Sequence, residues 1–239
     1  TGAAPLPAQS FEKSADLYVR YGIDKGGKVR GRSKVNVAFK DDKYTPNTAI
    51  QACRELAASS FLLVGAGGTD QIQACAQFAD KSAIPYLSPG VTEVGLSSLK
   101  TYFATGMTYP AQTDLLAQYV KKNFPGKKAG AIITNTPNFD DAANAWDKAV
   151  KVHGINYYKT LRHPKSNNSW NTTYASEMKS NGVEVLFILS SPVDYIHVAQ
   201  QAGTQGYHPP YGGCGIPRAL TAVLGRGGPA GQVVIAVRL

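Results

Sequence analysis

The 239-residue sequence lacks long hydrophobic runs. Uninterrupted apolar segments such as residues 61–64 and 185–189 are only a few residues long, whereas a membrane-spanning helix needs about 20 predominantly apolar residues. The residues after Thr1 also lack the basic segment and apolar stretch of a signal peptide. We therefore expect no membrane-spanning helix, and a processed or a truncated start at Thr1 stays open as an alternative.

The signatures of common enzymes are also absent. The sequence has no Gly-x-Ser-x-Gly elbow, no Walker loop and no His-Glu-x-x-His pair. Adjacent carboxylates at 41–42 and 140–141 indicate loop or helix-start charges, because adjacent side chains do not converge on one bond. The four histidines lack the spacing of metal ligands and are interpreted as surface or satisfied core residues; they are His153, His163, His197 and His208. We expect no catalytic residue, no metal and no cofactor.

Charged residues are scarce, at 17% against 43% hydrophobic residues, which predicts a buried core rather than a disordered chain. Lysine and arginine outnumber aspartate and glutamate 25 to 16, and the net charge of +9 lies mostly in residues 121–239. A basic chain raises nucleic acid as a partner. The basic residues are dispersed, however, and the densest run, residues 25–34, is typical of a glycine-rich solvated turn. We expect no nucleic-acid partner.

Short apolar strands alternate with amphipathic helices along the sequence. Strands are expected at residues 33–39, 61–64, 84–87, 102–105, 128–134, 156–161, 183–189, 210–213 and 233–237. Helices are expected to begin at Thr45-Pro46, at Asp70, after Pro110 and before Ala142, and to cover residues 170–180, 193–202 and 219–224. This alternation predicts an α/β fold with parallel sheets covered on both faces. So many strands exceed one doubly wound half, so we expect two lobes, residues 1–107 and 108–239.

A glycine-rich loop, residues 65–70, stands between an expected strand and an expected helix. Free N–H groups and the helix dipole favour an anion at such a place. A dinucleotide fingerprint needs glycine at position 70, where Asp70 stands, and this argues against a nicotinamide cofactor. The loop is either a glycine turn capped by Thr69 or Asp70, or a site where Thr69 and nearby amides hold a ligand's carboxylate.

Other loops follow the expected strands in both lobes. Residues 88–92 lie in the first lobe, and residues 135–139, 190–192 and 212–215 lie in the second. Because open α/β sheets bind ligands beyond the carboxyl ends of their strands, we expect two facing rims and a ligand cleft. A clamp of this kind requires no hydrolase or dehydrogenase residues.

These segments resemble the type I periplasmic binding proteins, in the subgroup of leucine/isoleucine/valine-type amino-acid receptors of ABC transporters. The resemblance covers residues 15–27, 35–53, 64–76, 84–92, 183–203 and 211–216. It implies two doubly wound, Rossmann-like lobes that close on a ligand. It also implies that the first strand and the late return segment to the first lobe are missing, so we expect a fold truncated at both ends.

The resemblance also implies binding residues. In the first lobe, two loops that hold a ligand's carboxylate and ammonium correspond to Gly68-Thr69 and to Gly90 with Thr92. In the second lobe, Phe139 matches an aromatic residue, whereas Ser191 replaces a tyrosine and Cys214 replaces the acidic partner of the ammonium; these three complete the expected set. The two replacements predict a preference for carboxylates without a free α-ammonium group.

The implied function is that of a non-enzymatic receptor. It would bind a small carboxylate-bearing ligand, an amino acid or an organic acid, and deliver it to the membrane permease of an ABC transporter. It is expected outside the cytoplasm, periplasmic or lipid-anchored at the cell surface, and as a monomer when complete. The alternatives are the ligand-binding sensory domain of a signalling receptor and, in another class, an NAD-type oxidoreductase.

The three cysteines are Cys53, Cys75 and Cys214. Cys53 and Cys75 fall on expected helices that flank one strand, and an exported protein would oxidise a suitable pair. The alternative is two buried thiols that act as small hydrophobic residues. If the first two pair, Cys214 is left unpaired.

Overall fold

The computed structural model describes residues 9–24, 35–65, 68–90, 94–165, 169–214 and 234–237. The chain divides into two compact units, Thr1–Pro89 with Ser98–Phe103 and Gly90–Ser97 with Ala104–Leu239. The structure assigns Gly90–Ser97 to the second unit, whereas the division expected after residue 107 places this segment in the first lobe. Within the described ranges, no helix combines the length and hydrophobicity needed to cross a membrane.

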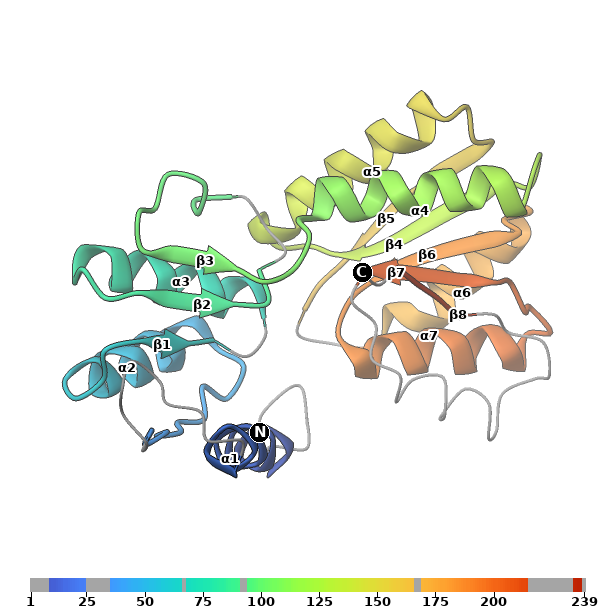
Figure 1. Cartoon of the computed structure of the whole chain (residues 1–239). Helices are drawn as coiled ribbons and strands as arrows, with labels where there is room; N and C mark the ends of the chain where they lie inside the picture. Colours follow the sequence, from blue (N-terminus) through green and yellow to red (C-terminus); the bar gives the residue numbers. More distant parts are fainter. Residues whose placement is uncertain are drawn as a thin grey trace. The chain divides into compact units, whose positions relative to one another are not determined.

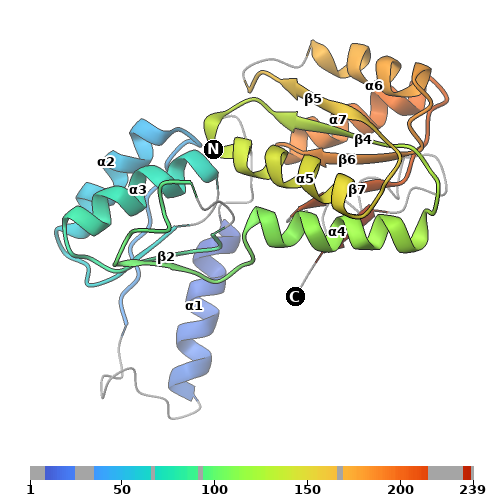
Figure 2. The same cartoon turned by 90° about the horizontal axis from the view of Figure 1, so that it is seen from above.

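In its described residues, the first unit contains a three-stranded sheet and three helices. Its strands are β1 (Leu63–Val64), β2 (Tyr86–Ser88) and β3 (Tyr102–Ala104), in that order. β1 and β2 are parallel. Helices α2 (Pro46–Ala57) and α3 (Thr69–Lys81) pack together on one side of this sheet (Figure 2). The remaining helix is α1 (Gln9–Asp24).

Local chemistry explains where α2 begins. Thr45 Oγ1 accepts a hydrogen bond from Thr48 N–H at 3.4 Å, and Pro46 is the first helical residue. This confirms the helix start expected at Thr45-Pro46, because proline has no N–H to leave unsatisfied there.

Two expected strands of the first unit differ from the structure. Residues 35–39 form no strand, and Val37 and Phe39 are 49% and 43% exposed. Their alternating pattern is insufficient because no described strand pairs with them. The strand expected at 61–64 is reduced to β1, in which Leu63 is 4% exposed but Val64 is 70% exposed. It is not buried on both faces, because the described helices α2 and α3 pack on one side of this sheet, and β2 is its one neighbour among the described strands.

The second unit is a five-stranded parallel sheet in the order β5-β4-β6-β7-β8 (Figure 1). The strands are β4 (Ala129–Thr134), β5 (Tyr157–His163), β6 (Val185–Leu189), β7 (Tyr211–Cys214) and β8 (Val234–Val237). The helices are α4 (Tyr109–Asn123), α5 (Asp140–Val152), α6 (Trp170–Ser180) and α7 (Pro192–Thr204). The order confirms a doubly wound sheet, whose switch point lies between β4 and β6. The helix expected at 219–224 lies outside the described residues.

Hydrophobic cores cover both faces of this sheet. Ala131, Ile133 and Phe187 pack with α4 and α5, whereas Ile132 and Ile188 pack with α6 and α7. Figure 1 shows these helix pairs on opposite sides of the strands. Alternate residues of β4 and β6 therefore enter opposite cores, as parallel strands buried on both faces require.

Lysines close the carboxyl ends of two helices in the second unit. Lys121 Nζ donates to Gly154 O at 3.0 Å, just beyond α5, and Lys128 Nζ donates to Asn181 O at 3.0 Å, just beyond α6. A cation is favourable at the negative end of a helix dipole. Part of the basic surplus of the second half therefore has a structural role.

Candidate functional site

The predicted binding loops at Gly68-Thr69 and at Gly90 follow two paired strands of the first unit, although Gly90 itself is counted with the second unit. Because β1 and β2 are parallel, their carboxyl ends share one edge of the sheet. Gly68 and Thr69 follow β1, and Gly90 follows β2. The structure therefore brings these residues to one edge. Thr92 lies outside the described residues.

Gly68 occupies the cap position of α3. Its φ is +87°, a left-handed value that glycine adopts readily. A Cβ on Gly68 would lie 2.9 Å from Tyr44 Cε2 and would collide with the Gln71 side chain. The expectation that Thr69 or Asp70 caps this helix is therefore wrong: Thr69 is already its first residue, and the cap needs glycine.

A buried amide lies at the same helix start. The Gln71 side chain is 2% exposed, and neither its Oε1 nor its Nε2 has a hydrogen-bond partner among the residues that the structure describes. Thr69 is 5% exposed. The first N–H groups of a helix lack intrahelical acceptors and carry the positive end of its dipole. This corner can therefore bind a carboxylate, which would accept hydrogen bonds from the helix and from Gln71 Nε2.

Three predicted residues of the second unit also share one edge. Phe139 follows β4, Ser191 follows β6, and Cys214 is the last residue of β7. These strands are neighbours in the order β4-β6-β7. Phe139 is 9% exposed, and its ring centroid lies 5.8 Å from that of Tyr109, so most of this side chain packs into the core of the unit.

Ser191 fixes the start of α7. Its Oγ accepts a hydrogen bond from Asp194 N–H at 3.2 Å and donates to Asp194 Oδ2 at 2.8 Å. The bond from Asp194 N–H is the usual N-cap bond of a helix, and the bond to Asp194 Oδ2 adds to it. Ser191 remains partly exposed, so the residue that replaces a tyrosine of the resembled family presents a hydroxyl group at the edge.

Behind Ser191 lies a buried polar cluster formed by Thr134, His163, Ser190 and Asp194. Ser190 Oγ lies 2.9 Å from His163 Nε2 and donates to Asp194 Oδ2 at 2.6 Å. Thr134 Oγ1 lies 3.1 Å from His163 Nε2 and donates to Ser190 Oγ at 3.0 Å. His163 is 0% exposed and Asp194 is 8% exposed. The polar cluster joins β4, β5 and α7 at the switch point, where open α/β sheets bind their ligands.

The surroundings of His163 favour its neutral form. Its Nδ1–H donates to Pro164 O at 3.0 Å, and its ring stacks on Trp170 with centroids 3.8 Å apart. Burial lowers the pKa of His163 below its usual value; the Pro164 carbonyl and the Asp194 carboxylate oppose this shift, and the Arg162 charge adds to it. His163 is therefore neutral at pH 7, with Nε2 as an acceptor that faces two hydroxyl groups.

Arg162 holds the loop that follows β4. Its Nη2 donates to Thr134 O at 3.1 Å, to Thr136 O at 3.4 Å and to Asp140 Oδ1 at 2.8 Å. Asp140 is the first residue of α5, as its interpretation as a helix-start charge requires. The ion pair neutralises Arg162 at the edge of the sheet.

The sequence analysis missed the polar cluster. It places Ser190 in a strand-end loop and interprets His163 as a surface or core residue, without connecting the two. Thr134, His163 and Ser190 lie 27 to 56 residues from one another in the sequence, so only the strand order brings them together. The available signal is that Thr134, His163 and Ser190 each end or follow a strand.

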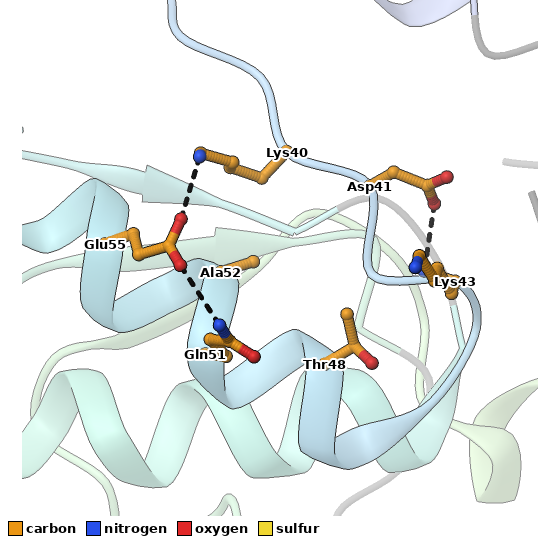
Figure 3. Close-up of a pocket in the computed structure, with 7 residues that line it drawn as sticks. All are labelled: Lys40, Asp41, Lys43, Thr48, Gln51, Ala52 and Glu55. Atoms are coloured by element: carbon orange, nitrogen blue, oxygen red, sulfur yellow. Dashed lines mark hydrogen bonds and ion pairs between the residues drawn. The ribbon is translucent and has the colours of Figure 1, made fainter.

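A shallow hollow on the first unit lies apart from these loops. Its lining consists of Lys40, Asp41, Lys43, Thr48, Gln51, Ala52 and Glu55 (Figure 3). Lys40 Nζ and Glu55 Oε2 form an ion pair at 2.8 Å. None of the predicted binding residues lines this hollow. In the described part of the chain, no group of three or more His, Cys, Asp or Glu residues could hold a metal ion.

A disulfide joins Cys53 of α2 to Cys75 of α3, with Cα atoms 6.0 Å apart. The structure thus contains the pair expected from the sequence instead of two free thiols. It links the two helices that pack on the sheet of the first unit.

The chain matches relatives along its length. The family model described as periplasmic binding protein matches residues 1–238. A Leu/Ile/Val-binding protein homologue of Brucella melitensis is 24% identical over 192 residues, which are 78% of this chain and 51% of the relative. The chain therefore spans about half the length of this curated relative.

Solved structures share the fold. A leucine binding protein of Thermotoga maritima has a TM-score of 0.78 at 14% identity, over 90% of this chain and 62% of that protein. An ABC-transporter solute binding protein of Rhodopseudomonas palustris in complex with 3,4-dihydroxybenzoic acid has a TM-score of 0.72 at 19% identity. The match covers 90% of this chain and 59% of that protein. Together with the family model, the parallel sheets and their strand-end loops lead to one conclusion: the chain belongs to the type I periplasmic binding proteins.

Proposed function

We propose that this protein is the extracytoplasmic solute-binding receptor of an ABC transporter, a non-enzymatic protein that delivers a small carboxylate-bearing ligand to the membrane permease. The observation that carries the proposal is the start of α3, where the buried Gln71 amide lies without a partner among described residues at the positive end of the helix dipole. Thr69 and the Gly68 and Gly90 loops would complete this carboxylate subsite, and Thr92 would add a second hydroxyl.

The proposed ligand lacks a free α-ammonium group. Two carboxylates at the edge of the second unit are already engaged: Asp194 by Ser190 and Ser191, and Asp140 by Arg162. An ammonium group there would need a carboxylate partner, because an unpaired buried cation is costly. Aromatic or aliphatic carboxylates avoid this cost. The dihydroxybenzoate bound by the Rhodopseudomonas palustris protein supports this class, and the leucine binding protein of similar fold supplies the competing class.

Calorimetric titration with benzoate, 3,4-dihydroxybenzoate and leucine tests the proposal. We expect the aromatic carboxylates to bind more tightly than leucine. Thr69→Ala should weaken binding by about tenfold or more, because a hydrogen bond to a charged group contributes about 1.5–3 kcal/mol. Thr173→Ala, which removes the same hydroxyl from an exposed position of α6, is the matched control and should bind as the wild type does.

Two results would contradict the proposal. Equal affinities of the wild type and Thr69→Ala would remove the first-unit loop from the site. Tight binding of leucine without any heat from the aromatic carboxylates would show that the ligand class is wrong.

A further inference from the structure

We propose that His163 is a positioning residue for ligand binding in the second unit: it takes up a proton when a carboxylate ligand binds and thereby lets the Ser191 hydroxyl turn toward the ligand. This inference rests on the proposed function. It assigns a role to the polar cluster, which the residues expected to contact the ligand do not by themselves explain.

In the neutral cluster the Ser190 proton has a choice of two acceptors, and the Thr134 hydroxyl, 3.1 Å from His163 Nε2, can serve that nitrogen when Ser190 does not. Ser190 has one proton, and both Asp194 Oδ2, at 2.6 Å, and His163 Nε2, at 2.9 Å, can accept it. Protonation of His163 removes this competition. Its Nε2–H then donates to Ser190 Oγ, and the Ser190 proton is committed to Asp194. The proton passes from solvent to Nε2, and the only internal change needed is rotation of a hydroxyl group.

Asp194 is the residue that connects this change to the ligand. Its Oδ2 accepts hydrogen bonds from both Ser190 and Ser191, and the residue is 8% exposed. Turning the Ser191 proton away would leave a buried carboxylate short of a donor, which is costly while His163 is neutral. An imidazolium linked to Asp194 through Ser190 offsets that loss. Ser191 Oγ can still accept from Asp194 N–H, so α7 keeps its cap.

Among the described residues, few charges surround His163, and their signs decide the direction of the effect. Asp194 faces it from α7, and Arg162 precedes it on β5 with its own charge paired to Asp140 of α5. α6 contributes the uncharged Trp170 ring, and β4 contributes the Thr134 hydroxyl.

A carboxylate ligand whose charge reaches this edge would raise the pKa of His163 from its lowered value in the free protein. Proton uptake on binding means that affinity rises as the pH falls through the window between the free and bound pKa values. The slope is limited to one proton, or about tenfold in Kd per pH unit.

The test is calorimetry on the purified protein with 3,4-dihydroxybenzoate and leucine as probes, at pH 5.5 to 7.5 and in two buffers of different ionisation enthalpy. We expect proton uptake on binding and a Kd that increases as the pH rises. His163→Gln retains a polar group near the Nε2 position but does not titrate, so its Kd should be independent of pH and its heats equal in both buffers. His208→Gln, at an exposed histidine outside the cluster, should behave as the wild type does.

The outcomes separate the two claims. Binding with equal heats in both buffers, or the same pH profile for the wild type and His163→Gln, overturns the role of His163 and leaves the receptor function standing. No binding of either probe at any pH contradicts the receptor function itself. If His163→Gln does not fold, NMR titration of the His163 imidazole in the unaltered protein replaces it: a pKa that rises on adding the bound probe supports the inference, and an unchanged pKa overturns it.

Discussion

Ser190→Ala removes the central hydroxyl of the polar cluster, and the structure sets the size of the effect. The substitution deletes the donor to Asp194 Oδ2 at 2.6 Å and the contact with His163 Nε2 at 2.9 Å. Hydrogen bonds to charged groups contribute about 1.5–3 kcal/mol. Ser191 still donates to the same Asp194 oxygen, so the carboxylate is not left without a donor. We therefore expect a loss at the low end, about 1.5–2 kcal/mol.

Tryptophan fluorescence is a selective assay for this loss. The chain has two tryptophans, and both Trp146 and Trp170 lie in the second unit. For a chain of this size, the expected loss lowers the melting temperature by about 3–8 °C. Ser180→Ala, at an exposed position at the end of α6, is the matched control and should melt close to the wild type. Equal melting of Ser190→Ala and Ser180→Ala would refute the cluster as a stabilising network.

Three further predictions concern the rest of the chain. Gly130→Ala should destabilise the second unit by about 1–3 kcal/mol in the same fluorescence melt, because its Cβ would lie 2.7 Å from Met178 Sδ; stability equal to the wild type would contradict the packing of β4 on α6. Asp80 accepts backbone hydrogen bonds that lower its pKa, so its stabilising effect should be present above pH 3.8 and lost as the pH falls through the lowered pKa. Asp80→Asn should flatten this acid-side loss in far-UV circular dichroism, and an unchanged acid transition would refute the assignment. Replacing Cys53 and Cys75 by serine should cost the first unit about 3 kcal/mol in denaturant unfolding, and an unchanged midpoint would contradict a stabilising disulfide.

The second unit could be predicted well from the sequence, because there the hydrophobic pattern of each segment agrees with the environment that the sheet provides. Residues 185–189 are apolar throughout and form a central strand buried on both faces, and residues 170–180 form the expected helix. In such a sheet, hydrophobic pattern and tertiary environment lead to the same structure.

The first unit was harder to predict because strand formation depends on partners. Val37 and Phe39 alternate with polar residues, as in a strand, yet no described strand pairs with residues 35–39. The cap at Gly68 was missed for a different reason, since a positive φ is a property of the backbone that threonine and aspartate nearby do not reveal.

The candidate site was only partly predictable. Loops after parallel strands must share an edge, so the grouping of Gly68, Thr69 and Gly90 follows from the strand pattern alone. The orphaned amide of Gln71 and the contact between His163 and Ser190 depend on side-chain burial and on strand order. No spacing rule connects residues that meet only after the sheet has formed.

The central claim is that strand-end loops of this chain bind a carboxylate ligand, and amide NMR during titration with 3,4-dihydroxybenzoate tests it most directly. The account predicts saturable shifts at Thr69 and Gln71 at the start of α3 and at Ser191 at the start of α7. Shifts confined to the hollow around Lys40 and Glu55, or no shift with this ligand, benzoate or leucine, would contradict it.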